Sequence, residues 1–281
     1  MLAIALGLGV AVTYGTGDFF GGVASSRARV ASVIVLAHLA GALGLLVVVP
    51  FAGGRVSVAA LADGAAGGLI GLCGLLLFYR GLAGGRMAVV APVSAVVAAM
   101  VPVLVGVLRG ERLGALAVLG IVAALVGVVL VSTGEGTASG RPVMRSVRDD
   151  VLLALGAGLA FGVVFAILGS VPDDGGLWPV LAQRVTSTTA VSLALVASGS
   201  FALPGPGARR PSLASGLLDT AANALFVLAA RAGDLAVAGV LGSLYPVATV
   251  VLAWRVLHEH VRPVQIVGVV IALGGAGLLA V

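Results

Sequence analysis

Four ionisable residues interrupt long apolar runs of this 281-residue chain: Asp18, His38, Arg184 and Asp219. An ionisable side chain inside an apolar helix costs about 3 kcal/mol even on the mildest scale, so each one is by default a functional candidate. Groups of both charge signs are suited to bind the charged ends of a solute or to couple its movement to an ion. The alternative is that these ionisable groups only pair with one another between helices and have no role in function.

Asp18 and His38 are expected to lie at similar depth. Asp18 stands about six residues before the end of an expected helix over 3–24, and His38 about eight residues after the start of the next over 30–51, at a rise of 1.5 Å per residue. The two helices form an antiparallel hairpin, so we expect the side chains to pair. Tyr79, near the end of the third helix on the same side, is a further candidate.

Arg184, Asp219 and Asn223 form a second predicted group. Asp219 and Asn223 are four residues apart and share a helix face. Arg184 lies at the depth of Asn223 within the polar run "QRVTSTTAVS", which is poorly suited to face lipid. We predict that this group recognises the solute, with a purely structural ion pair as the alternative.

Two weaker motifs complete the candidates. Ser243 and Tyr245 stand before Pro246, where a loosened helix would allow them to line a cavity. The triplet "HEH" at 258–260 has metal-ligand types, but a tight loop rarely gives two histidines the geometry of a metal site. We expect no metal and no cofactor.

Composition places these residues in a membrane protein. The chain is 60% hydrophobic and 10% charged, against roughly 25% charged in soluble domains. The formal charge of +5 comes from arginines scattered singly and in pairs, and aromatic residues make up only 5%. A nucleic-acid site requires a basic patch with aromatics, so no nucleic-acid partner is expected.

Apolar runs of about twenty residues predict an all-α protein with ten transmembrane helices. The expected spans are 3–24, 30–51, 59–80, 87–108, 114–133, 151–171, 177–198, 212–231, 235–257 and 263–281. The long polar connection 134–150 divides the chain into halves 1–133 and 151–281, each with five helices. An odd number of spans inverts the second half, as in many secondary transporters.

The halves repeat in sequence. "ALGLGVA" at 5–11 returns as "ALGAGLA" at 154–160. The same spacing also relates three residues of the first half to three of the second: Glu111, Gly120 and Gly127 to Glu259, Gly268 and Gly275.

These features of the scaffold repeat, but the four internal charges do not. Asp18 aligns with Ile167, and Asp219 with Gly71. The charges are therefore expected to serve a particular task rather than the scaffold.

The repeated carboxylates Glu111 and Glu259 lie in the turn before the last helix of each half, at headgroup level. Neighbouring bases such as Arg109 and Arg112 are expected to pair with Glu111. A repeated charge in a repeated position indicates a structural role, with a transport role as the alternative.

Together these motifs give a sequence that resembles the EamA-type transporters of the drug/metabolite transporter superfamily. The resemblance rests on "GERL" at 110–113, "LYPVATVVLAWRVLHEHV" at 244–261, "YGTGDFFGG" at 14–22 and the glycine-punctuated last helices. It departs from the family pattern at Tyr14, where Trp is usual, and in the second turn, where His258 and His260 replace Gly and Arg.

The resemblance implies a bacterial inner-membrane transporter, often an exporter of amino acids or other small metabolites. Its cavity is expected between the first four helices of each half. The expected partners are a small-molecule substrate and the lipid bilayer; a homodimer is left open. The rival interpretations are a membrane-embedded enzyme and a non-transporting membrane subunit, but no constellation of nucleophile, acid and base indicates an enzyme.

The orientation in the membrane is left open by two conflicting signals. Eleven arginines fall in the odd-numbered connections: Arg27, Arg29, Arg80, Arg86, Arg141, Arg145, Arg148, Arg209, Arg210, Arg255 and Arg262. Four fall on the other side: Arg55, Arg109, Arg112 and Arg231. The positive-inside rule places both termini outside, whereas the resemblance places them in the cytoplasm.

Overall fold

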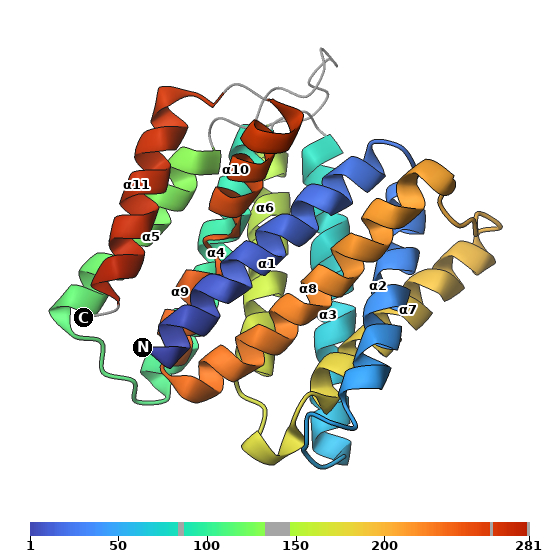
Figure 1. The fold of residues 1–281 in the computed structure, drawn as a ribbon, viewed down its shortest axis with the longest axis horizontal. Helices are drawn as coiled ribbons and strands as arrows, with labels where there is room; N and C mark the ends of the chain where they lie inside the picture. The colour runs from blue at the N-terminus through green and yellow to red at the C-terminus, as the bar shows by residue number, and fades with distance from the viewer. Residues whose placement is uncertain (84–86, 133–146, 259–260, 280–281) are drawn as a thin grey trace.

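The computed structural model describes residues 1–83, 87–132, 147–258 and 261–279 and shows a bundle of helices (Figure 1). The helices are α1 (Leu2–Ser25), α2 (Val30–Val48), α3 (Val58–Ala83), α4 (Met87–Leu108), α5 (Ala115–Ser132), α6 (Val147–Leu168), α7 (Trp178–Ala197), α8 (Pro206–Ala232), α9 (Leu235–Gly242), α10 (Tyr245–Leu257) and α11 (Pro263–Leu278). A 3-10 turn, η1 (Asp173–Gly175), precedes α7.

Ten apolar spans are found in the described part of the chain. Eight are long and apolar enough to cross a membrane, and two shorter apolar helices, over Pro92–Leu108 and Pro263–Leu278, complete the set. Large apolar side chains such as Leu119, Val122 and Val270 are exposed on the outer surface, as a surface facing lipid requires. The predicted ten-helix, all-α membrane fold is confirmed.

The ninth span is broken into two helices, α9 and α10. The continuous apolar span runs over Leu235–Val256, but the helix is interrupted by a turn at Ser243 and Leu244. Pro246, at the start of α10, has no backbone N–H and so cannot donate the hydrogen bond that would continue the preceding helix.

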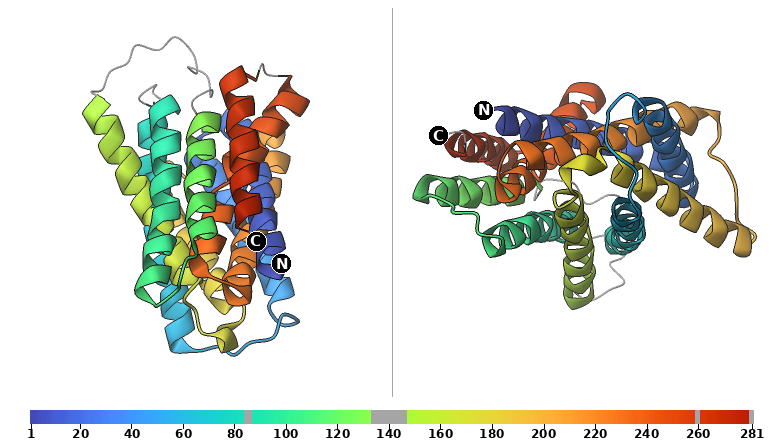
Figure 2. Two further views of the ribbon diagram at one scale, coloured as in Figure 1. Left: turned by 90° about the vertical axis from the view of Figure 1, so that its left-hand side faces the viewer. Right: turned by 90° about the horizontal axis from the view of Figure 1, so that it is seen from below.

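The two halves interlock with two-fold regularity. Helix α1 packs on α8 as α6 packs on α3, and α2 packs on α8 as α7 packs on α3. Helix α4 packs on α6, and the broken span α9–α10 packs correspondingly on α1. Helices α5 and α11 pair with each other at one edge of the bundle (Figures 1 and 2). The largest helix–helix contacts therefore join one half to the other.

Repeated glycines set the contact between α5 and α11. A Cβ on Gly127 would lie 2.5 Å from the backbone nitrogen of Ala272, and one on Gly275 would lie 2.5 Å from that of Ala124. Both contacts are related by the same separation of 148 positions. Small residues allow such close backbone approach in lipid, so these glycines are required by packing.

Candidate functional site

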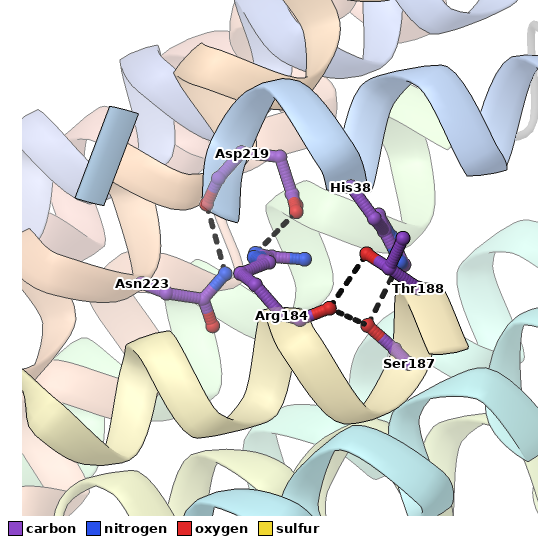
Figure 3. Close-up of polar contacts among 6 residues, drawn as sticks. All are labelled: His38, Arg184, Ser187, Thr188, Asp219 and Asn223. Carbon is purple, nitrogen blue, oxygen red and sulfur yellow. Dashed lines mark hydrogen bonds and ion pairs between the residues drawn. The ribbon is translucent and has the colours of Figure 1, made fainter. Parts of the chain in front are cut away.

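The predicted pair of Arg184 and Asp219 forms an ion pair between α7 and α8 (Figure 3). Nη2 of Arg184 contacts Oδ2 of Asp219. The arginine side chain is 5% exposed and that of the aspartate 32%. One turn further along α8, Nδ2 of Asn223 donates to the backbone carbonyl of Asp219 at 2.8 Å. The three residues predicted as one group therefore lie together.

The polar run on α7 explains why the arginine points inward. Gln183, Arg184, Ser187 and Val191 are buried, whereas Val185 is exposed. A spacing of three to four residues places the buried side chains on one face of the helix. Helix α7 packs against α2 and α3, so the polar side chains of the run are directed into the bundle.

His38 of α2 joins this cluster through α7. Its Nδ1 lies 2.9 Å from Oγ of Ser187 (Figure 3). The hydroxyls of Ser187 and Thr188 both donate to the backbone carbonyl of Arg184, at 3.2 and 2.7 Å. Sequence reasoning singled out neither hydroxyl, although both lie within the polar run that it recognised.

Glycine contacts show which positions of α2 and α7 are equivalent in the two repeats. A Cβ on Gly68 of α3 would meet the carbonyl oxygen of Gln183, and one on Gly216 of α8 would meet the carbonyl oxygen of Ala37. Gly68 and Gly216 have the 148-residue separation of the repeated glycines on α5 and α11. Gln183 and Ala37 are therefore equivalent positions of the two repeats.

The residues that follow Gln183 and Ala37 are Arg184 and His38, so the two basic side chains also occupy equivalent positions. The expectation that the internal charges have no matching charge in the other half stays a prediction, although His38 and Arg184 are both basic residues. A constant offset missed this equivalence because the shift between α2 and α7 is 146 residues. Two equivalent helices in direct contact must lie at the axis that relates the repeats, here called the repeat axis. The cluster therefore lies beside this axis.

Aromatic side chains border the cluster. The ring of Tyr14 on α1 lies 5.9 Å from that of Phe165 and 6.5 Å from that of Tyr245, both edge-on. Phe165 in turn stacks on Phe226 at 4.7 Å. A Cβ on Gly17, on the same helix as Tyr14, would lie 3.3 Å from the backbone nitrogen of Asp219, so α1 passes close to the ion pair. Sequence reasoning did not select Tyr14 or Phe165.

Asp18 lies one turn beyond Tyr14, and the spacing of four residues places both on one side of α1. The side chain of Asp18 is exposed. Exposed Ala5 and Val12, seven residues apart, mark a different side of the same helix as its outer face. The predicted pairing of Asp18 with His38, whose described bond is to α7, stays a prediction.

The other candidates are placed differently. Ser243 is fully buried at the helix break and donates to the carbonyl of Val240 at 2.7 Å, so its hydroxyl is directed at its own helix. Tyr245 begins α10 and is partly buried beside Tyr14. Tyr79 lies on α3, with its side chain outside the described part of the structure.

Glu111 binds the backbone of the other half. Its Oε1 accepts the N–H of Leu235 at 2.7 Å, and its Oε2 accepts the N–H of Ala236 at 3.1 Å. The carboxylate thus caps the first turn of α9. The predicted pairing with Arg109 and Arg112 gives way to this cap, because free N–H groups at a helix start bind an anion well. Glu259, with His260, lies outside the described residues.

The sequence matches the model of the EamA-like transporter family over residues 1–133 and 150–281. The chain belongs to the EamA-like transporter family. One solved crystal structure of another protein has a TM-score of 0.77 with this chain at 17% sequence identity, covering 99% of this chain and 98% of that one. That likeness shows the fold alone. No curated protein matches the sequence.

As an EamA-like transporter, the chain is a multi-pass integral membrane protein whose family moves small molecules across the bilayer. Members of the family are typically transporters rather than enzymes. The charged cluster at the repeat axis is thus found in a protein whose family carries solutes.

Proposed function

We propose that this EamA-like protein is a secondary transporter that moves a small organic solute by alternating access. We further propose that it exports an amino acid or a related metabolite across a bacterial cytoplasmic membrane. Two inverted repeats, 1–133 and 151–281 joined by the linker 134–150, would supply the two alternative openings.

The observation that carries the proposal is the position of the buried Arg184–Asp219 pair beside the repeat axis. A site on that axis is equally close to both halves, so movement of one half against the other exposes it to either side of the membrane in turn. Ionisable groups at membrane depth mark solute and ion pathways.

A solute-accumulation screen tests the proposal. Cells with and without the protein would be loaded with amino acids, nucleosides and toxic cations, and efflux of each would be compared. We expect one chemical class to leave faster only when the protein is present. Purified protein in liposomes should reproduce that movement; a protein that moves none of these solutes in either system would instead fit a non-transporting subunit or an enzyme.

A further inference from the structure

The two partners of the Arg184–Asp219 ion pair differ in how far their side chains are exposed. Arg184 is 4% exposed as a residue, and its side chain 5%, whereas the side chain of Asp219 is 32% exposed. The arginine is fixed on α7, which packs on α2 and α3. The aspartate side chain is partly exposed, so it can leave the arginine with a smaller change in burial than the arginine would undergo.

Arg184 has hydrogen-bonding capacity that the described part of the protein does not use. Its Nε and Nη2 are buried and have no hydrogen-bond partner there, although Nη2 lies against Asp219. Nε and one Nη form an edge of the guanidinium that matches the two oxygens of a carboxylate. Buried donors are rarely left without an acceptor, so this edge is suited to bind an oxyanion.

Neighbouring polar groups are already engaged. Oγ of Ser187 is shared between His38 and the Arg184 carbonyl, and Oγ1 of Thr188 is bonded to the same carbonyl. The amide nitrogen of Asn223 donates to the backbone of α8. Among these described groups, the Arg184 guanidinium is therefore the one whose N–H donors are not all hydrogen-bonded.

A solute ion can replace either partner of the ion pair, and each replacement leaves a different side chain unpaired. The cost of that unpaired side chain indicates whether the solute group is an anion or a cation. A solute cation that bound Asp219 would leave the buried Arg184 without a partner, and breaking a buried pair in this way is strongly unfavourable. A solute anion that took Arg184 would release Asp219, whose partly exposed carboxylate can be hydrated. The second exchange is favoured.

We propose that Arg184 binds the carboxylate of the transported solute and that Asp219 is a tethered substitute that occupies Arg184 when no solute is bound. This inference rests on the proposed function and specifies its substrate as an organic acid or a zwitterion with an acid group. Each solute carboxylate displaces Asp219, and Asp219 returns when the solute leaves. Arg184 therefore keeps an anionic partner throughout the cycle.

Chemical rescue in purified, detergent-solubilised protein tests the site without knowledge of the solute. Asp219→Ala removes the tethered carboxylate and should lower the unfolding temperature. Sodium acetate should then raise that temperature by several degrees in a saturable manner, because a ligand that binds only the folded state stabilises it. Acetamide, and sodium chloride at equal ionic strength, should not.

Three controls assign the rescue to Arg184. The double variant Arg184→Gln/Asp219→Ala should not respond to acetate, and the wild type should respond much less because Asp219 competes. Asp63→Ala removes an exposed carboxylate on α3 and should give no rescue. Equal stabilisation of all variants by acetate, or none of Asp219→Ala, would overturn the proposal; poor folding of Asp219→Ala is met by repeating the titration on Asp219→Asn.

A transport measurement separates this inference from the proposed function. For the solute found by the screen, Asp219→Asn should lower KM several-fold and Arg184→Gln should raise it, and the amide analogue of the solute should not be carried. Transport that is indifferent to the acid group overturns the inference and leaves the transporter intact. Acetate rescue in a protein that moves no solute supports the Arg184 site and overturns the proposed function.

Discussion

Glu111 binds Leu235 across the two halves of the chain, through a 2.7 Å hydrogen bond from the Leu235 N–H to the glutamate carboxylate. Glu111 follows the fourth helix of the first half, and Leu235 begins α9, the first part of the broken span in the second half. A turn in one half thereby fixes the start of a discontinuous helix in the other. Glu111, which marks the end of a helix in the first half, therefore also joins the two halves through hydrogen bonds.

Glu111→Ala should therefore destabilise the protein while sparing transport per folded molecule. Loss of a helix cap costs about 0.5–2 kcal/mol, and both N–H groups at the start of α9 lose their acceptor. Glu111→Gln keeps one acceptor oxygen and should retain most transport and stability. Unfolding in detergent and transport at equal membrane abundance measure the two effects.

Arg112→Gln is the matched control, because Arg112 is exposed and the Glu111 carboxylate binds the backbone of α9 instead. We expect no measurable change in stability. Complete loss of transport by Glu111→Gln at normal abundance would show that the carboxylate takes part in transport itself.

Replacement of both Arg184 and Asp219 should restore folding relative to the single replacements but should not restore transport. Asp219→Leu should reduce folded protein more, because it strands the buried charge of Arg184 at a cost of about 3–5 kcal/mol. Arg184→Leu should reduce it less, because the Asp219 side chain that remains is 32% exposed. The double variant should recover folding, since no charge remains, yet fail to transport. Folded yield from fluorescence-detected size exclusion and liposome transport check this. Full transport by the double variant would remove the pair from the binding site.

The bond between His38 and Ser187 should stabilise the contact of α2 with α7. Ser187→Ala leaves Nδ1 of the histidine without its described partner, and an unsatisfied buried group costs about 1–3 kcal/mol. Thr188→Ala is the control, because Thr188 bonds only the backbone of its own helix among the described contacts, and its effect should stay below about 0.5 kcal/mol. Equal unfolding temperatures for the two variants would contradict this role.

Two glycines of α11 should respond oppositely to alanine. A Cβ on Gly275 would lie 2.5 Å from the Ala124 nitrogen, whereas a Cβ on Gly277 meets nothing within 4 Å. Gly275→Ala should thus destabilise the protein by about 1–3 kcal/mol through overpacking. Gly277→Ala should be neutral or stabilising, by up to about 1 kcal/mol of helix propensity. Denaturation of both variants in mixed micelles provides the comparison.

Features set by local sequence, such as the length of each span and the position of a helix break, were predicted well from the sequence. Apolar run lengths predicted the ten spans, and Pro246 marked the place where the ninth span breaks. The start of α8 at Pro206 rather than at 212 was missed. The prolines between 203 and 211 suggested a loop before the eighth span, although proline fits the first turn of a helix.

Side-chain partners were harder to predict, because they depend on how helices far apart in sequence are rotated and shifted against each other. The Arg184–Asp219 pair was expected from charge and depth, and the structure contains it. The Ser187 partner of His38 depends on how α2 packs against α7, which only the packed bundle reveals. The cap formed by Glu111 likewise requires a neighbour from the other half.

The orientation of the termini is tested by labelling single cysteines in intact cells. The eleven-to-four excess of arginine in the odd-numbered connections predicts that both termini are outside. In a background with Cys73→Ser, a membrane-impermeant maleimide should therefore label Asp174→Cys and leave Gly140→Cys unlabelled until the cells are permeabilised. The reverse pattern would mean that the arginines of the odd connections are not the dominant topogenic signal and that the termini lie in the cytoplasm, as the family resemblance implies.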